Sequence, residues 1–211
     1  MVVLHPNVPS WRSNYRISPD VEAHLRKTPW CIPILDPSNF IPILFHHRNP
    51  PPEFAGRYTF FSETLNTPRT IPVWESFYRP ARAPDDYGET VAIIELSVGL
   101  DGHPQRAQGG VAATILDEVA GIIGYMHKTA GKPIVTAYMN TSYRKSIPTP
   151  GMILAKAHLD GMRSVERKIF VKASLEDGNG VVYTEVEVLF IEVEPEKLAA
   201  GRELRATRGQ L

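Results

Sequence analysis

A long apolar stretch between residues 110 and 127 constrains the fold of this 211-residue chain more than any other feature. Its large apolar residues recur at the three- and four-residue spacing of an α-helix, at Val111, Ile115, Val119, Ile122 and Met126. Apart from Thr114 and the adjacent acids Asp117 and Glu118, the stretch up to Met126 is apolar, small or tyrosine. Because a helix that is hydrophobic nearly all round is normally buried, we predict one long helix enclosed by the rest of the fold.

Runs typical of β-strands flank this predicted helix. One run precedes it and four follow, at residues 89–98, 134–146, 152–161, 166–176 and 181–193. Asp177-Gly178-Asn179-Gly180 separates the last two runs and is a strong hairpin signal, because these residues tolerate a positive φ. Consecutive hairpins leave little room for parallel crossovers. We therefore predict an α+β fold, in which a curved antiparallel sheet of five or six strands ends in a meander and wraps around one central helix.

Proline usage divides the chain. Fourteen of the 19 prolines precede residue 85, and three of them are consecutive at Pro50-Pro51-Pro52. Because proline fixes φ and lacks a backbone N–H, residues 1–55 are predicted to be a largely irregular extension with one or two short helices, which packs as a lid over the core. Residues 56–197 form the main domain, and residues 198–211 form a C-terminal tail.

Charge and composition exclude several classes of partner. Basic residues (lysine and arginine) and acidic residues (aspartate and glutamate) number 23 each, so the charge does not favour binding of nucleic acid. We expect no membrane partner, because no apolar stretch reaches the length of a bilayer span. The single cysteine, Cys31, excludes an internal disulfide and suits a reducing compartment, so we expect a cytoplasmic protein. His46-His47 has no nearby ligands at a recognisable metal-site spacing, so we predict no metal.

Two features of the predicted helix carry chemistry. A buried carboxylate either pays a desolvation cost or has a raised pKa, so Asp117 or Glu118 is a candidate catalytic acid or base. The alternative is an exposed helix edge, or an ion pair with Arg144 or Lys145. The Gly109-Gly110 step begins the helix, where free backbone N–H groups can bind a developing oxyanion, although a glycine pair can also serve only a tight turn.

The motif carrying these residues resembles a known family. Gly-His-Pro-x-x-x-x-Gly-Gly-Val-x-Ala-Thr-x-Leu-Asp-Glu, ending at Glu118, is similar to the hotdog-fold acyl-CoA thioesterases, in the branch that includes phenylacetyl-CoA thioesterases. TAYMNTSYRKSIPTPG (136–151) and ERKIFVKASLEDGNGVVYTEVEVLFI (166–191) resemble the family's second signature strand and closing hairpin. The resemblance covers roughly residues 56–195.

The resemblance implies a hotdog fold that assembles sheet to sheet as a homodimer, or as a dimer of dimers, with the active site at the interface. Asp117 takes the position of the acid that activates water or attacks the thioester carbonyl, and Glu118 is the second choice. Gly109 matches the residue whose N–H binds the thioester oxygen, usually from the partner protomer. Thr136 lies at a position where relatives often have a serine or threonine that helps to place the water. No cofactor is implied beyond coenzyme A as part of the substrate.

The sequence departs from the family at one position and leaves other residues open. Relatives usually carry histidine before the Gly-Gly pair, whereas this chain has Gln108, which can orient the loop but cannot titrate near neutral pH. His103 is either a partial substitute or a loop residue without a chemical role. Basic residues near the strand ends either meet coenzyme A phosphates or are solvated edge charges: Arg144, Lys145, Arg163, Arg167 and Lys168.

Three functions fit these observations. The first is an acyl-thioester hydrolase that acts on acyl-CoA or a carrier-bound acyl group through Asp117. The second is a hotdog-fold tailoring enzyme of secondary metabolism, a dehydratase or isomerase that moves a proton on a polyketide-like small molecule. The third is a non-catalytic protein that binds an acyl ligand.

N-terminal aromatic residues, among them Phe45 and Phe61, either cap the acyl end of the pocket or serve packing alone.

Overall fold

A computed structural model describes residues 14–54 and 56–196 of the chain. The N-terminal part contains short elements: α2 (Pro19–Leu25), a 3₁₀ turn (Pro29–Cys31), α3 (Ile32–Leu35), β1 (Ile41–Ile43), a second 3₁₀ turn (Pro52–Phe54) and a π-helical turn (Phe60–Thr64). The remainder contains β2 (Val73–Arg79), β3 (Glu89–Leu96), a 3₁₀ turn (Val98–Leu100), β4 (Asp101–His103), β5 (Arg106–Ala107), α4 (Gly109–His127), β6 (Ile134–Tyr143), β7 (Gly151–Leu159), β8 (Lys168–Glu176) and β9 (Val182–Glu192).

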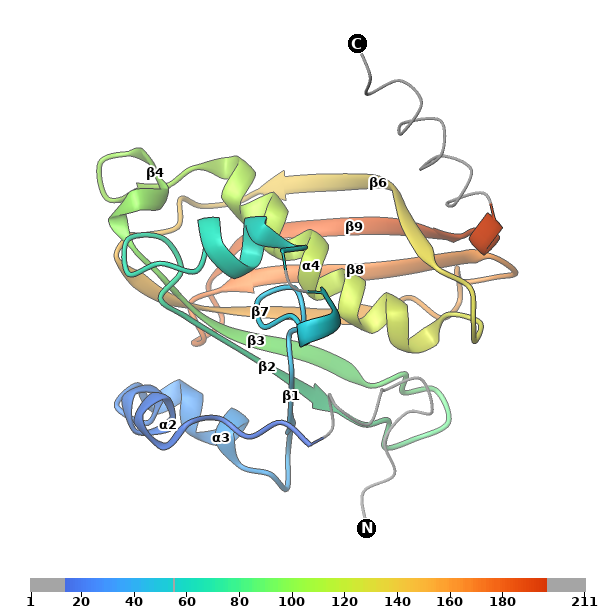
Figure 1. The fold of residues 1–211 in the computed structure, drawn as a ribbon, viewed down its shortest axis with the longest axis horizontal. Helices are drawn as coiled ribbons and strands as arrows, with labels where there is room; N and C mark the ends of the chain where they lie inside the picture. The colour runs from blue at the N-terminus through green and yellow to red at the C-terminus, as the bar shows by residue number, and fades with distance from the viewer. Residues whose placement is uncertain (1–13, 55, 197–211) are drawn as a thin grey trace.

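Within these described residues the main sheet has seven antiparallel strands in the order β1-β2-β3-β7-β8-β9-β6. It curves around α4 as predicted (Figure 1), and the five expected strands are present within a few residues of their expected bounds. The sheet has more than the five or six strands predicted, because β1 and β2 were not expected; the separate two-stranded ribbon of β4 and β5 was not predicted either. The expected meander holds for β7, β8 and β9, but β6 pairs with β9 rather than with β7, so the chain crosses between β6 and β7 from one edge of the sheet to its interior.

Helix α4 occupies the concave side of the sheet and is the centre of the main core. Ile115, Leu116, Val119 and Ile123 are fully buried in it, which explains the near-continuous apolarity of the stretch. By length and composition α4 alone, among the described helices, could cross a membrane; its place inside the curved sheet accounts for that apolarity instead. Its burial is not complete, because one stripe of the helix remains half-exposed.

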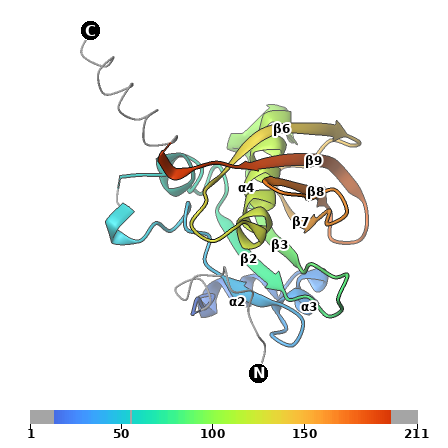
Figure 2. The ribbon, with the colours of Figure 1, turned by 90° about the vertical axis from the view of Figure 1, so that its right-hand side faces the viewer.

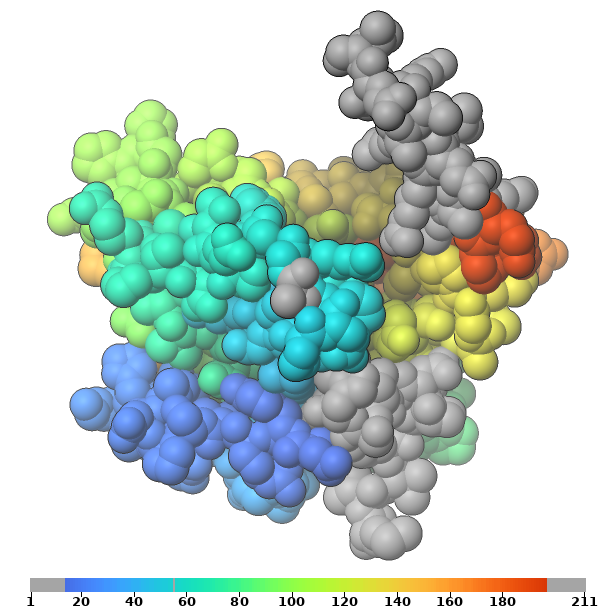
Figure 3. Space-filling model, viewed as in Figure 1, coloured from blue at the N-terminus to red at the C-terminus, as the bar shows by residue number. Residues whose placement is uncertain are grey.

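The N-terminal helices α2 and α3 cover the opposite, convex side of the sheet (Figure 2). The alternation along β3 demonstrates this two-sided packing, since Val91 and Ile93 contact the N-terminal helices while Ala92 and Ile94 contact the α4 side. The two short helices contribute Leu25 and Ile34 to this second cluster. After β1 the chain passes to the other side of the sheet, and in Figure 3 the cyan segment beyond β1 occupies the middle of the α4 side.

Candidate active site

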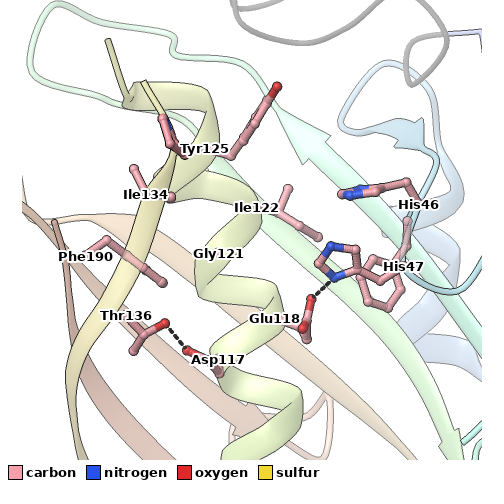
Figure 4. A pocket seen from close by; sticks show the side chains of 12 residues that line it. His46, His47, Asp117, Glu118, Gly121, Ile122, Tyr125, Ile134, Thr136 and Phe190 are labelled. Carbon is pink, nitrogen blue, oxygen red and sulfur yellow. Dashed lines mark hydrogen bonds and ion pairs between the residues drawn. The ribbon is translucent and has the colours of Figure 1, made fainter. Parts of the chain in front are cut away.

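A pocket of about 310 Å³ lies over the half-exposed stripe of α4. The helix contributes Asp117, Glu118 and Gly121 to its floor, at positions that share one helix face. Two walls enclose this floor: β6 and β9 on one side, and the segment after β1 on the other (Figure 4). The lining residues are Phe45, His46, His47, Asp117, Glu118, Gly121, Ile122, Tyr125, Pro133, Ile134, Thr136 and Phe190.

Asp117 faces the β6 wall. The Thr136 hydroxyl donates a hydrogen bond to Asp117 Oδ1, with 3.0 Å between the oxygens. Thr136 stands next to a β-bulge, because it pairs with Phe190 while Tyr138 pairs with Leu189, which leaves one extra residue in β6. Such a bulge redirects the side chains beside it. Two residues that the motif resemblance singled out separately are thus in contact within one chain.

Three effects act on the Asp117 carboxyl. Burial raises its pKa above the ordinary value, the hydrogen bond from Thr136 opposes that shift, and the neighbouring Glu118 charge adds to it. The net direction is upward, because desolvation is the largest of the three effects. A carboxyl with a raised pKa is a better proton acceptor once ionised, which suits a general base.

Glu118 faces the other wall and pairs with a residue that sequence reasoning had set aside. Glu118 Oε2 lies 2.7 Å from His47 Nδ1. Because a carboxylate only accepts hydrogen bonds, Nδ1 carries the proton in this contact. The ion pair of an acid with Arg144 or Lys145, considered as an alternative, is not the one observed, since Arg144 Nε binds Glu185 at 2.9 Å.

The wall that holds His47 is a turn over residues 45–48, which we call the 45–48 turn. The Arg48 N–H donates to the Phe45 carbonyl at 3.1 Å and closes the turn. Phe45 is buried and stacks on Trp74 with ring centroids 4.7 Å apart, and Arg48 Nη2 donates to the carbonyl of Ile71 at 2.6 Å. His47 is therefore presented to the pocket from a turn fixed at both ends.

The Gly-Gly step begins α4, as expected, but Gln108 has a structural role there. The Gln108 side chain caps the helix, since its Oε1 accepts a hydrogen bond from the Val111 N–H at 3.2 Å. Gly109 is exposed, and its carbonyl accepts a hydrogen bond from the Tyr143 hydroxyl at 3.2 Å. Gln108 therefore caps the start of α4.

Gly109 and Asp117 do not meet within one chain. Eight residues of α-helix separate them, and at a rise of about 1.5 Å per residue this places them about 12 Å apart along the axis. Gly109 instead lines a second pocket of about 290 Å³ with Tyr143, Arg144 and Lys145. One substrate carbonyl therefore cannot contact both groups of the same protomer.

The basic candidates separate into two groups. Arg144 and Lys145 follow β6, and both N–H groups donate to the Tyr183 carbonyl at the start of β9. Lys168 pairs with Ile191 at the other end of β9, next to Arg167. Eight strand residues, about 26 Å, separate the two groups. They cannot hold the same phosphate within one protomer.

The remaining candidates lie away from the main pocket. Exposed His103 is in the β4–β5 ribbon, where it pairs with Arg106. Arg163 forms an ion pair with Glu187 on β9. No group of three metal-ligating side chains occurs among residues 14–54 and 56–196. The sequence did show the His46-His47 doublet, but nothing in it could reveal contact with an acid 71 positions later.

Comparison with known proteins shows that the chain is similar to thioesterases. It is 31% identical over 109 residues to acyl-coenzyme A thioesterase THEM4 of Mus musculus, covering 51% of this chain and 45% of the mouse protein. The Rattus norvegicus protein of the same name is 28% identical over 108 residues, covering 51% and 44%. A crystal structure of a thioesterase superfamily protein superimposes with a TM-score of 0.48 and 25% identity over 60% of each chain. No family model matches the chain.

The chain matches less than half the length of these curated relatives. The THEM4 matches extend over about half of this chain, and the structure adds a curved antiparallel sheet wrapped around one long helix. The resemblance inferred from the sequence is thereby confirmed: the chain has the hotdog fold and is similar to the acyl-CoA thioesterases of that fold.

Proposed function

We propose that this protein hydrolyses acyl thioesters, with acyl-CoA or a carrier-bound acyl group as substrate. The observation that carries the proposal is the Thr136–Asp117 pair, which faces a pocket lined elsewhere by Phe45, Ile122 and Phe190. An apolar pocket with a few convergent polar groups is typical of a small-molecule site, and the acyl chain would occupy the apolar part. The similarity to THEM4 favours this reaction over others that the fold supports.

Asp117 has two possible roles in this reaction. As a general base it takes a proton from water while the water oxygen bonds to the carbonyl carbon, and as a nucleophile it bonds to that carbon itself. Thr136 suits either role, because its hydroxyl fixes the carboxylate orientation. The carbonyl oxygen gains negative charge in both cases, and a backbone N–H such as that of Gly109 would stabilise it.

The working assembly proposed here is a homodimer, alone or paired as a dimer of dimers. The separation of Gly109 from Asp117 along α4 supports it, since a partner would have to bring a second Gly109 to the pocket. Arg144 and Lys145 lie beside Gly109 and are the better placed of the two basic groups to meet phosphates of coenzyme A at such a site. A reducing compartment such as the cytoplasm suits the single, buried Cys31.

A thiol-release assay over acetyl-, hexanoyl-, phenylacetyl- and palmitoyl-CoA tests the proposal. Wild-type protein is expected to release free thiol from at least one of them, and Asp117→Asn to lose activity by about 100-fold or more while keeping the same fold by circular dichroism. The asparagine can still accept the hydrogen bond from Thr136, so the change removes mainly the charge. Lys132→Gln removes an exposed charge that pairs with Glu194, and serves as the control.

Three results would contradict the proposal. Undiminished hydrolysis by Asp117→Asn would show that another group drives the reaction. Retention of an acyl-CoA without thiol release by the wild type would favour the non-catalytic binding protein instead. Release of no thiol, with consumption of a hydroxylated or unsaturated substrate, would favour the dehydratase or isomerase.

A further inference from the structure

The pocket contains a second pair of proton-transfer groups that the proposed use of Asp117 leaves unexplained. His47 and Glu118 line the same pocket as Asp117, and their ring nitrogen and carboxylate oxygen are 2.7 Å apart. The His47 side chain is 28% exposed and that of Glu118 is 21% exposed, so neither is a surface ion pair. Burying such a pair costs free energy, because half-buried charges lose hydration, so a pair at this position suggests a function.

Glu118 determines which nitrogen of His47 is available. Nδ1–H donates to the carboxylate, which fixes the ring orientation and leaves Nε2 on the side away from Glu118 (Figure 4). Within residues 14–54 and 56–196, no hydrogen bond engages Nε2. An imidazole held through one nitrogen by a carboxylate, with the other nitrogen facing a cavity, is the usual arrangement of a histidine that transfers protons.

The ring itself is held rigidly. It stacks on Tyr58 with centroids 4.3 Å apart and an interplanar angle of 24°, and the His46 ring lies 4.1 Å away, centroid to centroid. The 45–48 turn beneath it is anchored by Phe45 and Arg48. A fixed ring needs little reorganisation when a substrate arrives.

The floor between the two acid–base groups is open. Gly121 follows Asp117 by four residues and Glu118 by three, so it lies on the same helix face as both acids. A Cβ added at Gly121 would meet no atom within 4 Å. Asp117 turns from this floor toward β6 and Glu118 toward the 45–48 turn (Figure 4), so a group lying over Gly121 would have one on each side.

We propose that His47 is a catalytic residue of this pocket, which donates a proton from Nε2 to the sulfur of the departing thiol, and that Glu118 is its positioning residue. The inference rests on the proposed thioesterase function. The step uses Asp117 as the general base and starts with His47 protonated on both ring nitrogens. As water bonds to the carbonyl carbon, its proton passes to Asp117. The C–S bond then breaks, its electron pair goes to sulfur, and the sulfur takes the Nε2 proton. The products are a carboxylic acid and a thiol, and the proton on Asp117 returns to His47 through water.

The physical reason lies in the charges around the pocket. A thiolate expelled beside the Glu118 carboxylate, in a half-buried site, would place two negative charges close together. Protonation at the moment of bond breaking avoids this cost. The groups that face His47 are Glu118 from α4, His46 from its own turn and Tyr58 from the following segment, and Glu118 alone carries a negative charge.

The dependence of rate on the leaving group tests this role. The probes are the most active acyl-CoA of the panel and the 4-nitrothiophenyl ester of the same acyl group, whose aryl thiolate leaves without a proton. His47→Gln is expected to lower kcat on the acyl-CoA by about 100-fold or more and to leave the aryl ester nearly unchanged. His47→Phe, which keeps a flat ring over Tyr58 but has no nitrogen, is expected to show the same pattern.

Two further variants test whether Glu118 positions His47 and whether the loss of a histidine damages the structure. Glu118→Gln should give a smaller loss with the same preference for the aryl ester, because a neutral amide still accepts from Nδ1–H but no longer supports the charged ring. His24→Gln is the matched control, since His24 forms a histidine–glutamate pair with Glu95 at 3.0 Å outside the pocket. It should leave both rates unaltered.

The outcomes are separable. Equal losses on both esters in His47→Gln and His47→Phe, with wild-type circular dichroism, would assign His47 a structural role and overturn the inference while the thioesterase function stands. Full activity of both variants on the acyl-CoA would overturn it as well. If the wild type hydrolyses neither ester, the proposed function fails, and this inference fails with it.

Discussion

Asp117 and Glu118 occupy consecutive positions of one helix and face different walls of the pocket. A helix turns by about 100° per residue, so neighbouring side chains diverge. Asp117 therefore meets Thr136 on β6, and Glu118 meets His47 on the 45–48 turn. The sequence placed two acids on an apolar helix and favoured Asp117 through the motif. The partner of Glu118 was not predictable, because contact across 71 residues leaves no local pattern.

Glu75 forms a buried polar cluster with Tyr15 and Arg48, and its titration predicts how the stability of the protein depends on pH. Burial raises the pKa of Glu75 to about 7 from 4.5, against the lowering effects of the Tyr15 hydrogen bond and the Arg48 charge. A carboxyl whose pKa is raised on folding keeps its proton longer in the native state. Wild-type stability should therefore fall as pH rises from about 4.5 to 7 and level off above it.

Glu75→Gln removes this titration. The variant should match the wild type near pH 4.5 and exceed it at pH 8, by an amount on the order of 3 kcal/mol in unfolding free energy. Urea unfolding at the two pH values measures the difference. Glu63→Gln, at an exposed glutamate, controls for the loss of one charge. A gain that is the same at both pH values would mean that Glu75 is not the titrating group.

At the level of elements, β6 is the most informative strand. It lies at one edge of the sheet and carries exposed Val135, Tyr138 and Tyr143. An exposed edge strand with large apolar residues is a template for pairing with another chain unless it is protected. This edge is therefore the surface on which the proposed homodimer would form, sheet to sheet.

Tyr138→Lys should weaken that assembly, because a lysine on an edge strand opposes pairing. Multi-angle light scattering is expected to show a shift from dimer to monomer, with a parallel loss of thioester hydrolysis if Gly109 acts across the interface. Met162→Lys changes a side chain that is 94% exposed, in the loop between β7 and β8, and should leave the mass unchanged. A Tyr138→Lys protein that remains dimeric would place the interface elsewhere.

The helix and most strands were predictable because their signals are local. The apolar spacing that ends at Met126 and the Asp177–Gly180 turn each specify one element without reference to the rest. β1 and β2 were not predicted because Pro42 interrupts the first and the second is buried on both faces. Glu75 and Ser76 stand in the middle of that second strand, so its sequence shows no apolar alternation. The neighbour of β6 is set by the crossover of residues 144–150, which no local pattern encodes.

On the scale of the whole molecule, the sheet has a core on each side. α4 fills one side, and α2 and α3 cover the other, with Leu25 and Cys31 fully buried there. The sequence predicted that the N-terminal segment packs over the main domain. It did not reveal that the segment contacts both sides, with its helices on the convex side and the 45–48 turn on the α4 side.

Leu25→Ala tests whether the second core is integral. Removing a fully buried leucine is expected to cost about 2–5 kcal/mol of unfolding free energy. For a domain of this size the thermal midpoint should fall by about 4–20 °C, at about 2–4 °C per kcal/mol. Ile32→Ala, at a position 47% exposed on α3, is the matched control and should change stability little. A similar small effect of both changes would show that the N-terminal helices are only loosely attached.

The two-sided packing also bears on how the chain is made. Leu25 leaves the ribosome long before Leu154 on β7, which belongs to the same buried cluster. The N-terminal helices are too short to be stable alone, so they have no surface to dock on until the middle of the sheet has been synthesised. In the same way, His47 is synthesised before Glu118 and can form its hydrogen bond only after α4 has emerged. Nascent chains should therefore acquire their N-terminal structure late, and protease protection of that segment during synthesis should appear only after β7 has emerged.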